Sequence, residues 1–212
     1  MLVQDIMQPD VMAISPKTTV PKILSLLQRR GVRHLPVVDG AELVGIVSDR
    51  DLKGAMLSAA SARAGDELAS LLDRLTAAQI MTPTVTTIGL TSPVEEAARL
   101  MVTKKISSVP VTEQGRLVGI VTETDVLQFL VKAMGAAEPS SRLDVVLKDE
   151  PAALTDVVTT IEASGMRISS MMTLAGLSGR REVAIRVTPI NPDPAIKALE
   201  AKGYIVRDSW RG

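Results

Sequence analysis

Residues 43–51 read Leu43-Val44-Gly45-Ile46-Val47-Ser48-Asp49-Arg50-Asp51, and residues 117–125 repeat the pattern as Leu117-Val118-Gly119-Ile120-Val121-Thr122-Glu123-Thr124-Asp125. The two stretches are 74 positions apart, and the same offset relates Ile6-Met7-x-Pro9 to Ile80-Met81-x-Pro83. It also relates Leu35-Pro36-Val37 to Val109-Pro110-Val111. Because all three pairs align without a gap, the sequence predicts two copies of one structural unit in the first two thirds of the chain.

Each copy predicts the order strand, helix, hairpin, helix. Apolar residues recur at helical intervals after Thr19 and after Ser92, and Ser92-Pro93-Val94-Glu95 has the spacing of a capping box. Two β-branched runs then flank a short polar turn, which is typical of a β-hairpin. Ser48 and Thr122 follow the second run at positions suited to cap a helix. The copies should pack as one body, because roughly 50 residues bury too little apolar surface to fold alone.

The repeat sets the domain boundaries that we expect. The first copy covers residues 1–60 and the second covers residues 79–135, joined by an Ala- and Leu-rich helical connector over 61–78 with a break near Gly65. Residues 136–141 indicate a linker, and residues 142–212 predict the order βαββαβ of the ferredoxin-like split motif. The predicted fold class is therefore α/β (α+β).

The composition excludes several classes of function. Phe129, Tyr204 and Trp210 are the only aromatic residues, so a base-stacking platform for single-stranded nucleic acid is excluded. The 24 Lys and Arg residues balance 24 Asp and Glu residues, so no net charge draws the chain to nucleic acid or anionic lipid. The absence of Cys and the single histidine, His34, argue against disulfides, cysteine zinc sites, multi-histidine metal sites and Ser-His-Asp chemistry.

Neither the apolar runs of the chain nor its first residues predict a membrane partner. No apolar run approaches the roughly 20 residues that a membrane-spanning helix needs. Asp5 also interrupts the start before a signal-peptide core could form. We therefore expect a cytoplasmic protein.

In these motifs the two copies resemble CBS motifs, and the tandem pair resembles a Bateman module over about residues 1–135. The resemblance rests on Met-x-Pro at each start, on the x-Pro-Val strand entry and on Gly-Ile-Val-Ser/Thr-x-x-Asp. It implies an adenosine-containing regulatory ligand bound between the copies. AMP, ADP or ATP is expected first, and S-adenosylmethionine or NAD stays open as a less favoured alternative. It implies no catalytic cofactor and no metal.

The last third resembles an ACT domain in its element order and in the turn Asp149-x-Pro151. ACT domains are regulatory modules that often bind amino acids and commonly pair, so the resemblance implies a homodimer. The family's turn usually carries Gly after the Pro, whereas this chain has Ala152. Two CBS motifs followed by an ACT domain are similar to the acetoin utilisation family, which implies a regulatory role toward an unidentified partner protein.

Two carboxylates are candidates for holding the ribose of such a ligand. Asp51 follows Ser48 by three residues, and Asp125 follows Thr122 by the same spacing. If Ser48 and Thr122 cap their helices, each carboxylate projects from a helix N-terminus beside a hydroxyl, where it could accept hydrogen bonds from both ribose hydroxyls. The same spacing is that of a purely structural capping box, and the two roles can coexist.

The two copies differ where a phosphate would lie. The first has Arg33 and His34 ahead of its Leu-Pro-Val strand, where the second has Ser107 and Ser108, and Arg50 corresponds to Thr124. Because arginine suits phosphate, we expect unequal clefts, with phosphorylated adenosine preferred beside Arg33 and His34. Purely structural roles stay open for two of these residues, namely a histidine satisfied by backbone and a solvated Arg50. Aliphatic residues, which are also core candidates, would form the adenine slot: Val11, Ile14, Leu35, Pro36, Val85, Ile88, Val109 and Pro110.

The leading functional hypothesis is a non-catalytic sensor, in which the nucleotide shifts the chain between two states. An enzyme is the second hypothesis, with Asp51, Asp125 or Asp149 as the acid, but no activated nucleophile, Walker loop or metal-ligand cluster accompanies them. A scaffold with vestigial ligand sites is a third hypothesis, and an amino-acid-responsive ACT regulator is a fourth.

Overall fold

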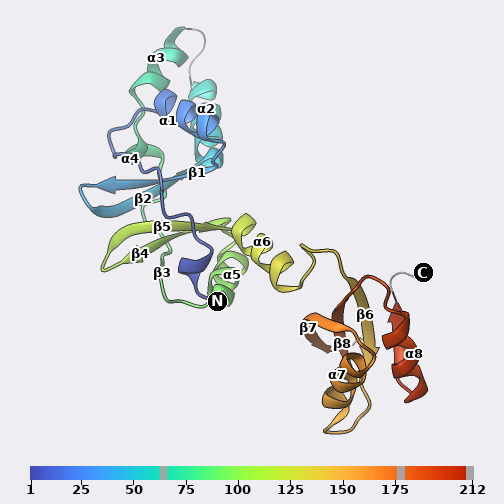
Figure 1. Cartoon of the computed structure of the whole chain (residues 1–212). Helices are drawn as coiled ribbons and strands as arrows, with labels where there is room; N and C mark the ends of the chain where they lie inside the picture. The colour runs from blue at the N-terminus through green and yellow to red at the C-terminus, as the bar shows by residue number, and fades with distance from the viewer. Residues whose placement is uncertain (63–65, 176–179, 209–212) are drawn as a thin grey trace. The chain divides into compact units, whose positions relative to one another are not determined.

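Two separate β-sheets organise the chain in the computed structural model, which describes residues 1–62, 66–175 and 180–208 (Figure 1). The five-stranded sheet belongs to a first unit, Met1–Val126, and the four-stranded sheet to a second unit, Leu127–Gly212. The mixed α/β class expected from the sequence is therefore found. In the described part of the chain, no helix combines the length and the apolar character needed to cross a membrane.

The first unit consists of two matching hairpins that meet edge to edge (Figure 1). The sheet order is β1-β2-β5-β4-β3, and β2 meets β5 through the pair Glu42 and Arg116. Both hairpins carry a register shift at equivalent places, between Val37 and Val38 and between Val111 and Thr112. The strands are β1 (His34–Asp39), β2 (Glu42–Ser48), β3 (Ile88–Gly89), β4 (Ser108–Glu113) and β5 (Arg116–Thr122).

Helices complete each copy. Helix α1 begins after Thr19, as expected, and ends at Gly31, whose φ of 63° lies in the left-handed region that glycine adopts readily. The expected capping box at Ser92 is wrong, because Pro93 occupies the cap position and no side chain caps that helix. The helical segments are η1 (Val3–Asp5), α1 (Val20–Arg30), α2 (Asp49–Ala62), α3 (Asp66–Arg74), α4 (Ala77–Ile80), α5 (Val94–Lys104) and α6 (Glu123–Ala133).

The leading segment of each copy crosses to the other copy. Gln8 pairs with Ile120 through two backbone hydrogen bonds of 2.9 and 3.0 Å, and Thr82 pairs with Ile46 at 2.9 and 3.1 Å. Met7 consequently lies against Gly119, and Met81 lies against Gly45, where a Cβ would approach the sulfur atom far inside contact distance. The repeated Met and the repeated Gly are therefore packing partners, each Met fitting the glycine of the opposite copy.

Part of the expected connector packs into the core of the first copy, which the sequence did not indicate. Helix α2 continues to Ala62, and the break expected near Gly65 lies outside the described residues. Ala77, in the expected connector, is fully buried in the core of the first copy together with Leu35 and Val37. At the end of the second copy, helix α6 continues past the boundary between the two units to Ala133.

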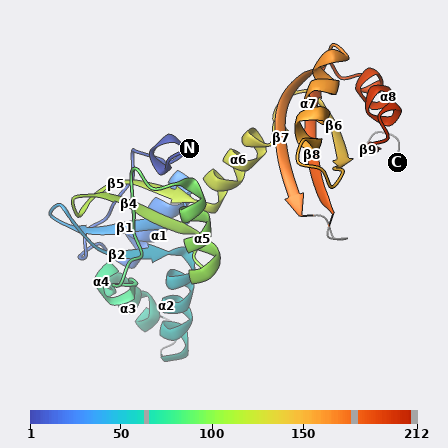
Figure 2. The ribbon, with the colours of Figure 1, turned by 90° about the horizontal axis from the view of Figure 1, so that it is seen from below.

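The second unit has the expected order βαββαβ, and its sheet order is β7-β8-β6-β9 with every pair antiparallel. This is the strand order of the ferredoxin-like split motif. Figure 2 shows α7 drawn across this sheet and α8 beside it. Alternate residues of β6 and β8 point into one core with both helices, which is the period-two pattern of a sheet covered on one face. The elements are β6 (Ser141–Val146), α7 (Ala153–Ala163), β7 (Arg167–Ala175), β8 (Arg181–Thr188), α8 (Asp193–Ala201) and β9 (Ile205–Asp208).

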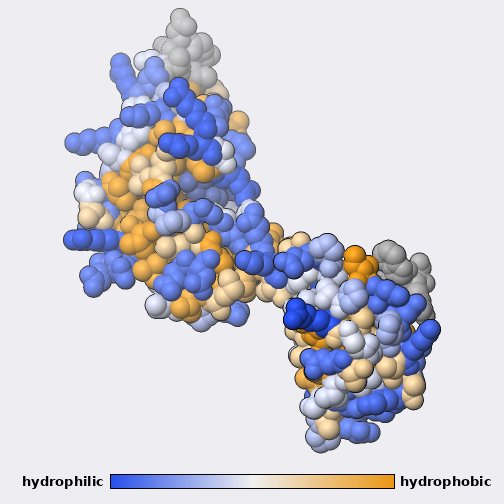
Figure 3. Space-filling model, in the orientation of Figure 1, coloured by the Kyte–Doolittle hydropathy of each residue, from blue (hydrophilic) through white to orange (hydrophobic). Residues whose placement is uncertain are grey.

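The surface is mixed rather than uniformly polar. In the view of Figure 3, apolar surface gathers over the part of the first unit that Figure 1 draws as strands β1, β2, β4 and β5, with hydrophilic residues around it. This part of the unit is where the two copies meet.

Candidate functional site

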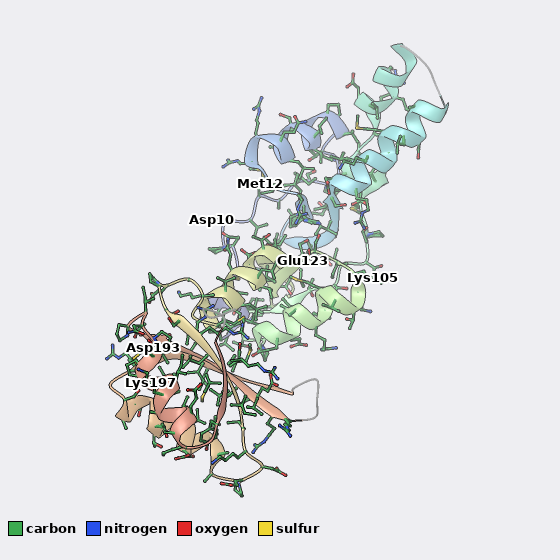
Figure 4. All side chains as sticks on the ribbon, turned by 90° about the vertical axis from the view of Figure 1, so that its right-hand side faces the viewer. Asp10, Met12, Lys105, Glu123, Asp193 and Lys197 are labelled. Carbon is green, nitrogen blue, oxygen red and sulfur yellow. The ribbon has the colours of Figure 1, made fainter. Side chains whose placement is uncertain are left out.

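A cavity of about 630 Å³ lies between the two copies of the first unit. The first copy contributes Arg33, His34, Ile46, Lys53 and the start of helix α2, Ser48–Asp51. The crossing segment contributes Thr82 and Thr84–Thr86, and the second copy contributes Lys105–Ser108 and Glu123. Figure 4 labels two of these residues, Lys105 after helix α5 and Glu123 at the start of helix α6.

Asp51 caps helix α2 with one oxygen only. Its Oδ2 accepts hydrogen bonds from the backbone N–H and from the Oγ of Ser48, both at 2.7 Å. The Asp51 N–H in turn donates to Ser48 Oγ at 3.3 Å, which completes a capping box. Among the described residues no hydrogen bond reaches Asp51 Oδ1, so this oxygen remains available to a ligand in the cavity.

Asp125 makes the same cap but has no oxygen left over. Its Oδ2 accepts from the N–H of Thr122 at 2.8 Å and from the Oγ1 of Thr122 at 2.6 Å. Its Oδ1 accepts from Gln8 Nε2 at 3.1 Å, and the residue is only 8% exposed. Asp125 and Thr122 are not in the wall of the cavity. The structural capping role is thus present in both copies, whereas of these two capping carboxylates Asp51 alone lies in the wall of this cavity.

Cationic side chains outnumber carboxylates around the cavity. Arg33, Arg50, Lys53 and Lys105 lie in its wall, together with Asp49, Asp51 and Glu123. Lys53 forms an ion pair with Asp49 at 3.2 Å, and this hydrogen bond is the main reason that the pKa of Asp49 lies below its usual value. The remaining cations leave the wall suited to an anionic group.

His34 lies at the same wall as an uncharged ring near neutral pH. Burial, and then the charge of Arg33, hold the pKa of His34 below its usual value. Its Nε2 lies 3.2 Å from Ser107 Oγ, which joins the first copy to the second. The ring is therefore satisfied by a side chain of the other copy rather than by backbone.

Most residues expected to hold the base lie elsewhere. Only Val85 lines the cavity, while Val11 is half-buried outside its wall and the other six are buried. Strand alternation explains the difference for Leu35 and Val109, because side chains next to one another in a strand point to opposite faces. It does not explain Pro36, which pairs with Ile46 across the hairpin and is nevertheless buried. Leu35 and Val109 point into the core at 0% exposure, whereas Ile46 lines the cavity. The other buried residues outside the wall are Ile14, Pro36, Ile88 and Pro110.

The structure adds residues that the sequence reasoning missed. Thr82, Thr84 and Thr86 enter the wall because the segment after Met81-x-Pro83 crosses to the first copy. Ile46 and Ile106 supply apolar surface, and Ile46 could have been found from its alternation with the buried Val47. Of the remaining expected residues, Arg33, His34, Ser48, Arg50, Asp51 and Ser108 all lie in the wall.

No metal centre accompanies the cavity in the described part of the chain. Among those residues, no group of three or more His, Cys, Asp or Glu side chains is placed to hold an ion.

Comparison with protein families finds that the model of the CBS domain matches residues 3–58 and 77–132, two segments again 74 positions apart. A CBS domain-containing protein of Dictyostelium discoideum is 34% identical over 142 residues, covering 66% of this chain and 98% of that protein. An inosine-5'-monophosphate dehydrogenase of Korarchaeum cryptofilum is 36% identical over 137 residues, but the match covers only 26% of that enzyme and 64% of this chain.

Three solved structures are also similar to the chain. CBSX2 in complex with AMP is 31% identical with a TM-score of 0.53, covering 62% of this chain and 96% of that one. The CBS domain pair of protein MJ0100, in complex with 5'-methylthioadenosine and S-adenosyl-L-methionine, is 28% identical with a TM-score of 0.54, covering 65% and 98%. A putative acetoin utilization protein (AcuB) from Vibrio cholerae is 28% identical with a TM-score of 0.55, covering 65% and 96%.

Proposed function

The chain belongs to the CBS domain family, and from that premise we propose that it is a non-catalytic regulatory protein that binds an adenosine nucleotide beside Asp51. The proposed ligand is AMP, ADP or ATP. The observation that carries the proposal is the unpartnered Oδ1 of Asp51, among the described residues, in a cavity whose wall also carries Arg33, Arg50 and Lys105. The complex of CBSX2 with AMP supports the ligand class.

Each part of a nucleotide has a matching group in the cavity. Asp51 Oδ1 would accept a hydrogen bond from a ribose hydroxyl, while Oδ2 keeps its bonds to Ser48. Arg33 and Arg50 would bind phosphate through their planar guanidinium groups, and His34 would add a polar contact. Val85, Ile46 and Ile106 offer aliphatic surface to the base. These cations favour a phosphorylated ligand over S-adenosylmethionine, which carries a positive sulfonium.

Calorimetric titration of the full chain tests this proposal. AMP, ADP and ATP should bind, and replacing Arg33 with Ala should weaken AMP much more than adenosine, because adenosine has no phosphate to lose. Equal weakening of both ligands, or no binding of any adenosine compound to the unmodified chain, would contradict the proposal. Hydrolysis of ATP above the blank would contradict a non-catalytic role.

We further propose that the second unit is an ACT-like regulatory domain that pairs two chains. Support comes from its βαββαβ order and from apolar residues on both edge strands, Met171 in β7 at 44% exposure and Ile205 in β9 at 55%. Sedimentation of the full chain should give a dimer, and a monomer at every concentration would contradict this. The similarity to the Vibrio cholerae protein supports a role in acetoin utilisation, which slower growth on acetoin after deletion of the gene would test.

A further inference from the structure

Gln8 and Thr82 occupy the same position in the two copies, and their side chains differ in length. Each lies in the segment that crosses to the other copy, and each pairs with the isoleucine of a hairpin strand, Ile120 in β5 or Ile46 in β2. The backbone hydrogen bonds of the two pairs are nearly identical, from 2.9 to 3.1 Å. We call the surroundings of Asp51 and of Asp125 the two half-sites. The backbone pairing is the same in both half-sites, so the side chain at this position is what differs between them.

In one half-site the longer side chain, which is itself exposed, bonds to the carboxylate. Gln8 Nε2 donates to Asp125 Oδ1 at 3.1 Å, and Thr122 engages the other carboxylate oxygen. Asp125 is 8% exposed, and each of its two carboxylate oxygens already accepts a hydrogen bond. A ribose hydroxyl would therefore have to compete with the Gln8 amide for Asp125 Oδ1.

The shorter side chain leaves the other half-site open. Thr82 is exposed in the wall of the cavity, and no hydrogen bond from the described residues reaches Asp51 Oδ1. Asp51 and Asp125 keep the same cap, so the difference lies in the residue that faces the carboxylate from the opposite copy.

The two half-sites also differ in charge. Arg33, Arg50, Lys53 and Lys105 line the open cavity, and the residues 74 positions away from them are Ser107, Thr124, Leu127 and Gly31. None of these four counterparts is charged. By the same offset, the wall residues Ser107 and Thr84 correspond to Arg33 and Asp10, so the Asp125 half-site would keep only Arg33 of these cations and would gain a carboxylate. Even without the Gln8 amide, it would thus be less suited to a phosphate.

We propose that Gln8 closes the Asp125 half-site, so that each chain binds one nucleotide, at Asp51. This inference rests on the proposed nucleotide function and adds its stoichiometry, the residue that sets it and the kind of ligand that the closed half-site would admit. The amide of Gln8 takes the place of a ribose hydroxyl at Asp125 Oδ1. Once opened, that half-site suits uncharged adenosine rather than AMP.

Exchanging the two residues tests the inference in both directions. Gln8→Thr gives the Asp125 side the residue that the other half-site already has, and Thr82→Gln does the reverse. Both substitutions retain the backbone pairs, and circular dichroism with thermal unfolding of the full chain checks that each variant folds. Calorimetry with AMP and with adenosine then gives the number of sites.

The unmodified chain should bind one AMP. Gln8→Thr should add a second site that binds adenosine more tightly than AMP, and Thr82→Gln should weaken AMP binding by roughly tenfold or more, the factor that corresponds to about 1.4 kcal/mol. The double exchange should keep one site per chain but change its preference from AMP to adenosine.

Three results would overturn the inference. Two equivalent sites in the unmodified chain would show that Gln8 does not close the second half-site, while nucleotide binding itself would stand. A folded Gln8→Thr variant that gains no adenosine site would also overturn the inference. The absence of binding by the unmodified chain and by all variants would overturn the proposed function as well.

Discussion

Asp51 and Ser48 share a single carboxylate oxygen, because Oδ2 of Asp51 accepts both the backbone N–H and the Oγ of Ser48 at 2.7 Å. The helix cap and the proposed ligand contact therefore use different oxygens of one side chain. A substitution that keeps one oxygen and removes the other can separate the two roles.

Replacing Asp51 with Asn should abolish most AMP binding while leaving the fold nearly intact. The amide oxygen can still accept from Ser48, but the group facing the cavity becomes a donor that carries no charge. We expect AMP affinity to fall by roughly a factor of ten to one hundred, the effect of one charge-assisted hydrogen bond. Calorimetry measures this loss.

Replacing Ser48 with Ala provides the matched control for Asp51→Asn. This variant loses the cap hydroxyl and should lose about 1 kcal/mol of stability, with a smaller loss of AMP affinity. If Asp51→Asn and Ser48→Ala weaken AMP equally, the carboxylate acts only through the helix.

The pKa of His34 should rise when AMP binds. In the free protein, burial and Arg33 keep this pKa below about 6.5, and a phosphate nearby would favour the charged imidazolium. Because His34 is the only histidine, one imidazole signal in the NMR spectrum reports its titration. Saturating adenosine should leave the pKa almost unchanged, and an AMP complex with the same pKa as the adenosine complex would place the phosphate away from His34.

Gly45→Ala should destabilise the first unit. The added Cβ would lie 2.9 Å from Met81 Cγ and closer still to the sulfur, so Met81 or the strand must move, at a cost of about 1–3 kcal/mol. Combining Gly45→Ala with Met81→Ala should recover about 1 kcal/mol relative to the sum of the single variants. Urea unfolding measures this coupling.

The control for Gly45→Ala is the same substitution at Gly54, where a new Cβ would meet nothing within 4 Å. Gly54 lies inside helix α2, so Gly54→Ala should stabilise the chain by about 0.5–1 kcal/mol. Destabilisation of similar size in both variants would contradict the contact between Met81 and Gly45.

Tyr204→Phe should cost the second unit about 1 kcal/mol at neutral pH, because the hydroxyl donates to Asp156 Oδ2 at 2.9 Å. Burial and then this hydrogen bond raise the pKa of Tyr204 to about 12. Between pH 10 and 12 the unfolded state therefore binds fewer protons than the folded state, and the free energy of unfolding falls as the pH rises. The unmodified chain should have its full excess in unfolding free energy over Tyr204→Phe below pH 10, and this excess should shrink toward pH 12. Urea unfolding at pH 8 and pH 11.5 checks this, and a constant difference would contradict it.

The repeat predicts what lies within each copy better than what passes between copies. Its hairpins and the helix starts at Ser48 and Thr122 depend on local patterns and are found in the structure. The contact between Gln8 and Asp125 joins residues 117 positions apart, and no local spacing reveals it. The crossing of the two leading segments is equally long-range, which is why Thr82, Thr84 and Thr86 were missed as wall residues.

The apolar candidates illustrate a second limit. Leu35 and Val109 were expected to serve both a base slot and the core, and the structure places them fully in the core. An apolar residue in a short β-branched run gives no sign of which face it occupies until the register of the strand is known. Polar residues such as Arg33 and Ser48 were easier to assign, because an unpaired polar side chain is costly to bury and so tends to remain at an opening.

The crossing of the two leading segments makes the copies interdependent for folding. The backbone of Val3 and of Gln8 completes the second copy, which begins more than seventy positions later. Trimming the first eight residues would therefore disrupt the distant second copy, while the first copy would keep the crossing segment around Thr82 that the second copy contributes. A fragment that held one copy alone would lack the segment that the other copy contributes, and its own leading segment would have no partner to pair with.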